Sequence, residues 1–297
     1  ITVGVVLVVD GHLDIGEMIG ANILAARALT PVVALCQQTE IWKRADQAKQ
    51  TIDDFERISF EKMDGSAFEN YRGNLEFRDV TFNYLARETP VIEKLSLSLG
   101  SGEVLCVTGA NGAGKTTLTK LVTGLLEPTE GYISVDGVNL KQLSLEWWRK
   151  QIIYLPQEPK FLEGSVRENF QAVNDGISDA QIRELLADVG LDEEIDKSVG
   201  GLDQGLNTSG SSLSLGVRRR LALARALIHK GKIAILDEPT EGIDAKGASH
   251  VYNVMSNLSK EGITLIICSH DNDVLNGAHH VLDLDDGERP TMRTVTH

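Results

Sequence analysis

A glycine-rich segment carries residues at a spacing that suits a phosphate group. It follows G-x-x-x-x-G-K-[ST] and consists of Gly109, Ala110, Asn111, Gly112, Ala113, Gly114, Lys115 and Thr116. Glycines let backbone N–H groups surround phosphates, and the start of a following helix adds a favourable dipole. We expect Lys115 to reach nucleotide phosphates, the Thr116 hydroxyl to bind Mg²⁺, and Thr117 to line the same site. The alternative interpretation is that this glycine-rich segment is a strand-to-helix turn that binds no ligand.

Two adjacent carboxylates, Asp237 and Glu238, follow the apolar run 233–236. A buried strand would deliver both to its C-terminal end, where ligands bind in open α/β sheets. We expect Asp237 to hold Mg²⁺, directly or through water. Glu238 is our candidate general base for activating water. Two adjacent acidic residues are also common on protein surfaces without a function. The phosphate loop upstream favours a role for this pair in a nucleotide site.

The elements that would position these residues alternate between strands and helices. Fully apolar runs are expected as strands at 104–107, 152–155, 233–236, 264–268 and 281–284. A helix is expected at 116–126, directly after the phosphate loop. This pattern predicts an α/β fold with a parallel sheet covered on both faces. An earlier strand begins near Leu75, and its pattern slips at Asp79-Val80, which indicates a bulge.

The N-terminal part of the chain, before the strand near Leu75, differs from the rest in its amino-acid composition. Residues 13–36 form an apolar stretch of about 24 residues, enough to cross a bilayer, although it contains Asp14, Glu17 and Arg27. The alternative is a buried helix of a soluble protein. Basic residues follow and place the C-terminal side in the cytoplasm. We predict a membrane part at 1–65, with a stalk at 37–62, and a second domain at 66–297, with the linker near 63–73.

The first residues and the composition add further expectations. Residues 1–9 suggest the end of a helix that begins upstream, and the chain opens without Met, which suggests a fragment. A net charge of −14 argues against nucleic acid as a partner, because phosphate backbones need clustered Lys and Arg. Cys36, Cys106 and Cys268 lie in or beside apolar runs, so we expect buried, reduced thiols.

Taken in order, these motifs resemble those of ATP-binding cassette (ABC) exporters. The resemblance implies ATP and Mg²⁺ as cofactors. It implies that Tyr84 stacks on adenine, and that Gln157, in Leu-Pro-Gln-Glu-Pro, senses Mg²⁺ and the attacking water. His270 resembles the switch histidine that contacts the γ-phosphate. Asp244 resembles the aspartate of the loop that follows the catalytic carboxylates.

The resemblance also implies a dimer of cassettes, in which one subunit completes the site of the other. The family signature Leu-Ser-Gly-Gly-Gln is Leu-Ser-Leu-Gly-Val here, so Ser214 and Gly216 are kept, while Leu215 and Val217 depart from it. Glu241-Gly242 also replaces the usual Ser-Ala. Lys115, the Mg²⁺ ligands, Glu238 and His270 remain. We therefore expect slow but real ATP hydrolysis.

The resemblance covers essentially the whole chain. The segment 19–31 resembles the last membrane helix of bacterial type I secretion exporters. The family resemblance implies a P-loop NTPase cassette with a mostly parallel sheet, antiparallel β and helical subdomains, and a preceding all-α membrane part. It also implies a multi-pass protein of the bacterial inner membrane with its cassette in the cytoplasm. The implied partners are a polypeptide substrate, a periplasmic adaptor, an outer-membrane channel and a second copy of the chain.

Three alternatives stay open at this stage. The exporter could carry a lipid, a drug or another small molecule. The departures at Leu215 and Val217 could instead mark an ATP-binding subunit that does not hydrolyse ATP and works in a heterodimer. A soluble cassette ATPase of DNA repair or translation is disfavoured by residues 1–36 and by the acidity of the chain.

Overall fold

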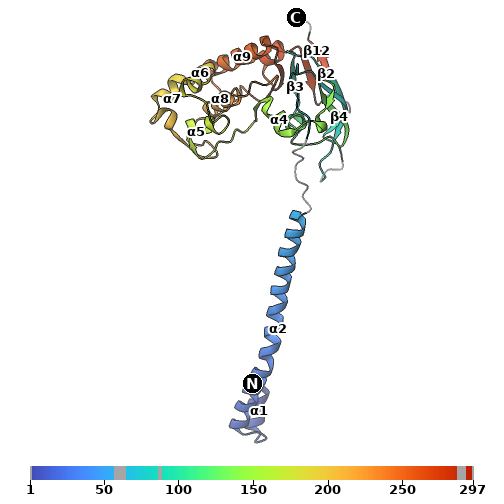
Figure 1. Ribbon diagram of the computed structural model, residues 1–297. Coiled ribbons are helices and arrows are strands. Elements are labelled where there is room, and N and C mark those ends of the chain that lie inside the picture. The colour runs from blue at the N-terminus through green and yellow to red at the C-terminus, as the bar shows by residue number, and fades with distance from the viewer. Residues whose placement is uncertain (1, 57–64, 86–88, 286–291, 296–297) are drawn as a thin grey trace. The chain divides into compact units, whose positions relative to one another are not determined.

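The computed structural model of the chain describes residues 2–56, 65–85, 89–285 and 292–295 (Figure 1). The chain divides into two compact units, Ile1–Glu61 and Lys62–His297.

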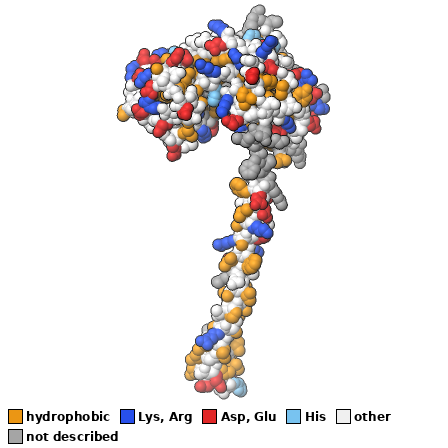
Figure 2. All heavy atoms as spheres, viewed as in Figure 1, with side chains coloured by type: hydrophobic (Ala, Val, Ile, Leu, Met, Phe, Trp, Pro, Cys, Tyr) orange, Lys and Arg blue, Asp and Glu red, His pale blue; other side chains and the backbone are white. Residues whose placement is uncertain are grey.

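The first unit consists, in its described part, of two helices. α1 spans Thr2–Val9, and α2 spans Ile15–Glu56. The expected membrane stretch and the described part of the expected stalk therefore form one helix, while stalk residues 57–62 lie outside the described residues. Among the described helices, α2 is long and apolar enough to cross a membrane, by length and composition alone. Hydrophobic side chains are exposed along it (Figure 2).

The cysteines differ from one another in burial. Cys106 and Cys268 are buried and carry free thiols, as predicted, but Cys36 is exposed. The prediction of burial is wrong for Cys36 because it lies on α2, which has only α1 beside it in the described part of the first unit. An apolar neighbourhood in the sequence does not by itself provide a packing partner.

The second unit is built on two sheets, which confirms the predicted α/β class. The larger sheet has the order β12 (Met292–Thr294), β11 (His280–Asp283), β3 (Val104–Thr108), β10 (Thr264–Cys268), β9 (Ile233–Asp237) and β6 (Ile152–Leu155). Its strands are parallel except for β12. The smaller sheet is antiparallel and has the order β2 (Ile92–Leu99), β1 (Leu75–Phe82), β4 (Glu130–Val135) and β5 (Val138–Asn139). The register of β1 shifts around Val80, which confirms the bulge.

The larger sheet separates two hydrophobic cores. Successive side chains of a strand point to opposite faces. In β3, Leu105 and Val107 therefore face the smaller sheet and α3 (Lys115–Val122), whereas Val104 and Cys106 face the core on the other side. That second core includes α8 (Leu215–Ala226) and α9 (Ala245–Lys260). Burial on both faces explains why these strands are apolar throughout.

The remaining helices and short strands complete the unit. They are α4 (Leu145–Lys150), α5 (Val166–Gln171), α6 (Asp179–Asp188), α7 (Asp192–Lys197), α10 (Asn272–Gly277), β7 (Gly164–Ser165), β8 (Gly205–Leu206) and the 3₁₀ turns at Leu140–Gln142 and Gly201–Asp203. In Figure 1, α5, α6 and α7 lie together at the end of the unit away from β2 and β4. These three helices thus form a helical end of the unit, away from the antiparallel sheet.

Two boundaries differ from expectation. α3 ends at Val122 and not near 126, because Gly124 takes a left-handed conformation with φ of 70°, which terminates a helix. The expected linker is described from residue 65 onward, and this part belongs to the second unit and contacts its other elements. Ser66 pairs with Leu143, and Tyr71 donates to the carbonyl of Gln151 at 3.2 Å.

Candidate functional site

The phosphate loop joins the end of β3 to the start of α3. Gly109, Gly112 and Gly114 have φ of 137°, 89° and 114°, in the region that favours glycine. A Cβ on Gly114 would also lie 3.0 Å from Val91. Side chains at these positions would strain the loop, so the glycine spacing is required by the backbone path itself.

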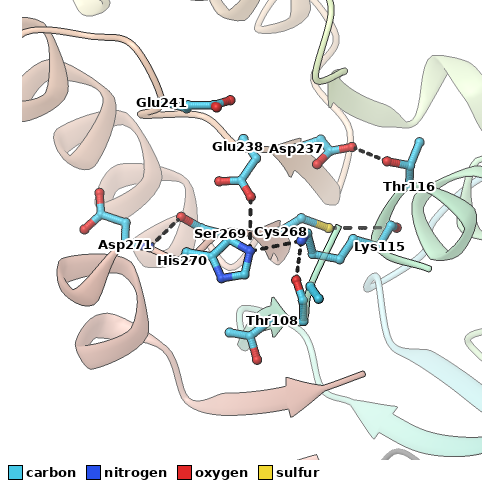
Figure 3. Close-up of polar contacts among 12 residues, drawn as sticks. Thr108, Lys115, Thr116, Asp237, Glu238, Glu241, Cys268, Ser269, His270 and Asp271 are labelled. Carbon is cyan, nitrogen blue, oxygen red and sulfur yellow. Dashed lines mark hydrogen bonds and ion pairs between the residues drawn. The ribbon is translucent and has the colours of Figure 1, made fainter. Parts of the chain in front are cut away.

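Lys115 is the first residue of α3, and its side chain is buried. Its Nζ donates to the carbonyl of Gly109 at 2.5 Å and lies 3.0 Å from Nε2 of His270 (Figure 3). His270 follows β10 and Ser269, as predicted. The sheet order places β10 directly beside β3, so the lysine of one loop and the histidine of the other meet above the same edge of the sheet.

The two candidate carboxylates lie at the end of β9. The Thr116 hydroxyl donates to Asp237 at 3.2 Å, and Glu238 lies 3.9 Å from His270 (Figure 3). Glu238 has a φ of 49°, which is costly for a residue with a side chain and is typical of functional sites. Its N–H donates to the carbonyl of Cys268 at 2.8 Å, which keeps this turn attached to the neighbouring strand.

Burial controls the acidity of both groups. It raises the pKa of Asp237, while the Thr116 hydrogen bond and the Lys115 charge act in the opposite direction. Burial likewise raises the pKa of Glu238 above its ordinary value, opposed by His270 and Lys115. A carboxylate with a raised pKa is a better proton acceptor, which suits the role expected for Glu238.

Most of the residues predicted to bind ATP and Mg²⁺ or to catalyse hydrolysis line a cavity of about 230 Å³. Its lining residues are Tyr84, Val91, Ala110, Asn111, Gly112, Gly114, Lys115, Thr116, Thr117, Gln157, Asp237 and Glu238. Tyr84 also places its hydroxyl 3.2 Å from that of Thr117. Gln157, on the loop after β6, thus reaches the same space as the carboxylates, although its loop is far away in the sequence.

Three side chains that line this cavity offer oxygen atoms that suit Mg²⁺. Thr116 offers a hydroxyl, Asp237 a carboxylate and Gln157 an amide, which are hard donors of the kind that Mg²⁺ prefers. No group of three or more His, Cys, Asp or Glu suited to a metal occurs among the described residues.

Five predicted ATP-binding residues lie outside the cavity lining. Gly109 and Ala113 belong to the phosphate loop itself, and the other three lie elsewhere. Ser214 caps α8 by accepting from the N–H of Val217 at 3.3 Å. Asp244 caps α9 by accepting from the N–H of Gly247 at 3.1 Å. Gly216 lies against the loop after β9, since a Cβ there would be 3.1 Å from the carbonyl of Gly242. The expected contact of Ser214 and Gly216 with the nucleotide of a second subunit stays a prediction, as does the role of Asp244 in ATP binding.

Several residues at the site are missed by sequence reasoning. Val91 lines the cavity, and Asp285 accepts from the N–H of Ala110 at 2.5 Å. Asp271 accepts from Thr240 at 2.8 Å and Tyr252 at 2.5 Å, and thereby anchors the residue next to His270. No spacing rule marks these residues, because each belongs to the site only through the fold.

The family described as ABC transporter matches residues 92–241, which include the phosphate loop, both carboxylates and the start of α8. This chain belongs to the ABC transporter family. Its second unit is therefore the ATP-binding cassette of such a transporter, and we call it the cassette from here on.

Similar proteins are bacterial translocation proteins. The chain is 30% identical over 288 residues to the alpha-hemolysin translocation ATP-binding protein HlyB of Escherichia coli. It is 29% identical to the toxin RTX-I translocation ATP-binding protein of Actinobacillus pleuropneumoniae and 28% identical to the leukotoxin export ATP-binding protein LtxB of Aggregatibacter actinomycetemcomitans. Each comparison covers 96% of this chain, and the chain spans about 40% of each relative's length.

A solved structure has the same fold. It is a bacterial Atm1-family ABC exporter with ATP bound, with a TM-score of 0.72 and 21% sequence identity. The comparison covers 95% of this chain and 50% of that one. Together with the family match, it confirms the predicted cassette fold.

Proposed function

We propose that this chain is the ATP-hydrolysing subunit of a membrane exporter. The observation that supports this most directly is the convergence of the Lys115 loop, Asp237, Glu238 and Gln157 on one cavity, with His270 beside Lys115. These residues come from loops after β3, β6, β9 and β10, all at the same edge of the sheet. Binding of ATP without hydrolysis would not need a partly buried carboxylate beside a histidine.

The proposed reaction is the attack of water on the γ-phosphorus of ATP. Backbone N–H groups of the loop and Lys115 hold the phosphates, while Thr116, Asp237 and Gln157 would hold Mg²⁺, which neutralises phosphate charge when bound. Glu238 takes a proton from the water as its oxygen bonds to phosphorus. The bond between this phosphorus and the bridging oxygen breaks, and ADP and inorganic phosphate are the products. His270 orients Glu238 and the γ-phosphate.

Replacing Glu238 by Gln tests this proposal. The amide keeps the shape of the side chain but cannot accept the proton, so ATP hydrolysis by the full chain should fall by at least about 100-fold. ATP binding, measured with a fluorescent analogue, should persist because Lys115 and its loop are intact. Glu127→Gln, which alters an exposed carboxylate of the cassette paired with Lys141, should leave the rate unchanged. Equal rates for the wild type and Glu238→Gln would refute the proposal.

The cargo that we propose is a secreted polypeptide. The relatives are named for translocation or export of a hemolysin, the RTX-I toxin and a leukotoxin. Their similarity covers 96% of the chain and therefore extends beyond the cassette motifs into the first unit. We further propose a multi-pass protein of the bacterial inner membrane with a cytoplasmic cassette, acting with a periplasmic adaptor and an outer-membrane channel.

A second candidate is an ATP-binding subunit of a heterodimeric transporter. The observation that favours it is Leu215, which is 39% exposed at the start of α8. We favour the homodimer, because Glu238 and His270 are both in place for hydrolysis. Hydrolysis by the purified chain alone supports the homodimer. Hydrolysis only after a different cassette chain is added supports the second candidate.

A further inference from the structure

Arg219 is a buried cation that the proposed mechanism does not use. It lies in α8, and its side chain is 4% exposed. One guanidinium nitrogen, Nη2, donates to the Glu241 carboxylate at 2.7 Å and to the carbonyl of Gln157 at 3.3 Å. The other, Nη1, donates to the carbonyl of Glu241. A single side chain therefore contacts two loops that are distant in the sequence.

Both of these loops reach the nucleotide cavity. Gln157 lines the cavity, and Glu241 belongs to the loop that starts with the cavity residue Glu238. Figure 3 shows Glu241 on the chain that continues from Glu238. Arg219 itself is not among the residues that line the cavity. Its effect on the site must therefore pass through the two loops.

The loop after β9 has little regular structure of its own. The backbone hydrogen bonds formed within this loop are long, at 3.3 Å from the N–H of Glu241 to the carbonyl of Glu238 and 3.3 Å from the N–H of Ile243 to the carbonyl of Thr240. An arginine suits the task of fixing such a loop, because its planar fork can serve several acceptors at once and is desolvated more readily than an ammonium group. Burial makes charge-assisted hydrogen bonds of this kind directional and strong.

We propose that Arg219 is a positioning residue for ATP hydrolysis, which holds the loops of Gln157 and Glu238 in register across the nucleotide cavity. The inference rests on the proposed function. It assigns a role to Glu241, whose carboxylate is the acceptor that keeps the buried guanidinium paired. The two loops then move as one body with the start of α8, so a shift of α8 is passed to both.

The chain offers a matched control in Arg220. This neighbour is also buried in α8, pairs with Glu194 at 3.3 Å and donates to the carbonyl of Gly190 at 2.8 Å. Its partners belong to the helical end of the cassette, and none of them lines the nucleotide cavity. Loss of Arg220 therefore reproduces the removal of a buried, paired arginine without loosening the nucleotide loops.

The test compares Arg219→Met with Arg220→Met in the full chain. Both should lower the thermal midpoint of the cassette. Only Arg219→Met should lower kcat, by about 10- to 100-fold, because small displacements of catalytic groups cost rate steeply. The KM for ATP and the affinity for a fluorescent ATP analogue should change by less than about three-fold, since Lys115 and its loop are untouched. Arg219→Lys keeps the charge but cannot serve all the acceptors, so it should restore kcat only partly.

A kcat for Arg219→Met that equals the kcat of Arg220→Met would overturn the inference. Should Arg219→Met fail to fold, Arg219→Lys and Glu241→Gln carry the test, and full kcat in both would overturn it equally. Wild-type and Glu238→Gln rates separate the two proposals. An inactive Glu238→Gln beside a fully active Arg219→Met removes only the role of Arg219.

Discussion

Leu215 and Val217 differ in what their side chains do, although both depart from the family signature. Val217 is buried in the core on the α8 side of the larger sheet. Leu215 instead lies over the loop after β9, with its Cδ2 2.7 Å from the position that a Cβ on Gly242 would take. Gly242 has a φ of 71° and leaves room for this leucine. The two departures at Leu215 and Gly242 thus fit each other.

Leu215→Gly is the informative change at this scale. It removes bulk beside Ser214 and Gly216, where the nucleotide of a second cassette is expected, so the ATPase rate should rise about two- to ten-fold, equivalent to about 0.4–1.4 kcal/mol in the barrier. A glycine in α8 should also lower stability by about 1 kcal/mol. Leu215→Ala removes the same bulk with better helix propensity and should accelerate hydrolysis without this loss. An unchanged rate in both variants would show that Leu215 does not limit turnover.

At the scale of elements, the turn between β4 and β5 binds the segment 72–74, which leads into β1. Asp136 has a φ of 45° in this turn and accepts from the N–H groups of Arg72, Gly73 and Asn74, at 2.6, 3.4 and 3.0 Å. Burial alone would raise the pKa of Asp136, but these hydrogen bonds lower it below its ordinary value of 3.8. The charged carboxylate therefore stabilises the fold.

Asp136→Asn should lower the free energy of unfolding of the cassette by about 1–2 kcal/mol at pH 7, because an amide is a weaker acceptor for three N–H donors. The folded-state pKa is depressed, so this stabilisation is present above pH 3.8 and is lost as the pH falls through the folded-state value. Urea unfolding followed by tryptophan fluorescence, at pH 7 and under acid conditions, measures the difference. Asp175→Asn, at an exposed position, is the control. A difference that persists unchanged in acid would contradict this account.

At the scale of the whole molecule, one feature concerns a membrane and another concerns a second copy of the chain. α2 has 42 residues and is about 63 Å long at 1.5 Å per residue, about twice the thickness of a bilayer core. In the cassette, Ser214, Gly216 and Asp244 are all outside the lining of the chain's own nucleotide cavity. We expect these residues to act on the nucleotide of a second copy.

ATP should therefore join two copies of the full chain. In detergent, Glu238→Gln should shift from monomer to dimer when ATP and Mg²⁺ are added, because trapped nucleotide keeps the composite sites closed. Light scattering coupled to gel filtration measures the mass. Lys115→Ala, which removes the phosphate-binding amine, should stay monomeric under the same conditions. A mass that does not change with ATP for Glu238→Gln would count against the paired cassettes.

The sequence by itself determined much of the local chemistry of this protein. The phosphate loop needs glycines at three positive-φ positions, so its spacing is visible without a structure. The strands before Asp237 and His270 are buried on both faces, so their apolar runs are equally visible. The parallel sheet, the bulge near Val80, the cavity residues of the phosphate loop and the pair Asp237 and Glu238 follow from such local rules. The positions of Tyr84 and Gln157 were implied by the family resemblance instead.

Only the tertiary structure decided which distant residues meet. In the sequence, Arg219 is one of four arginines on a predicted helix, and its contacts with Glu241 and Gln157 depend on how α8 packs behind two loops. Cys36 looked as buried as Cys106, yet burial depends on a neighbour that the local pattern does not reveal. Periodicity reports the exposure that a residue prefers, whereas pairing across a site depends on the sheet order and on where each loop ends.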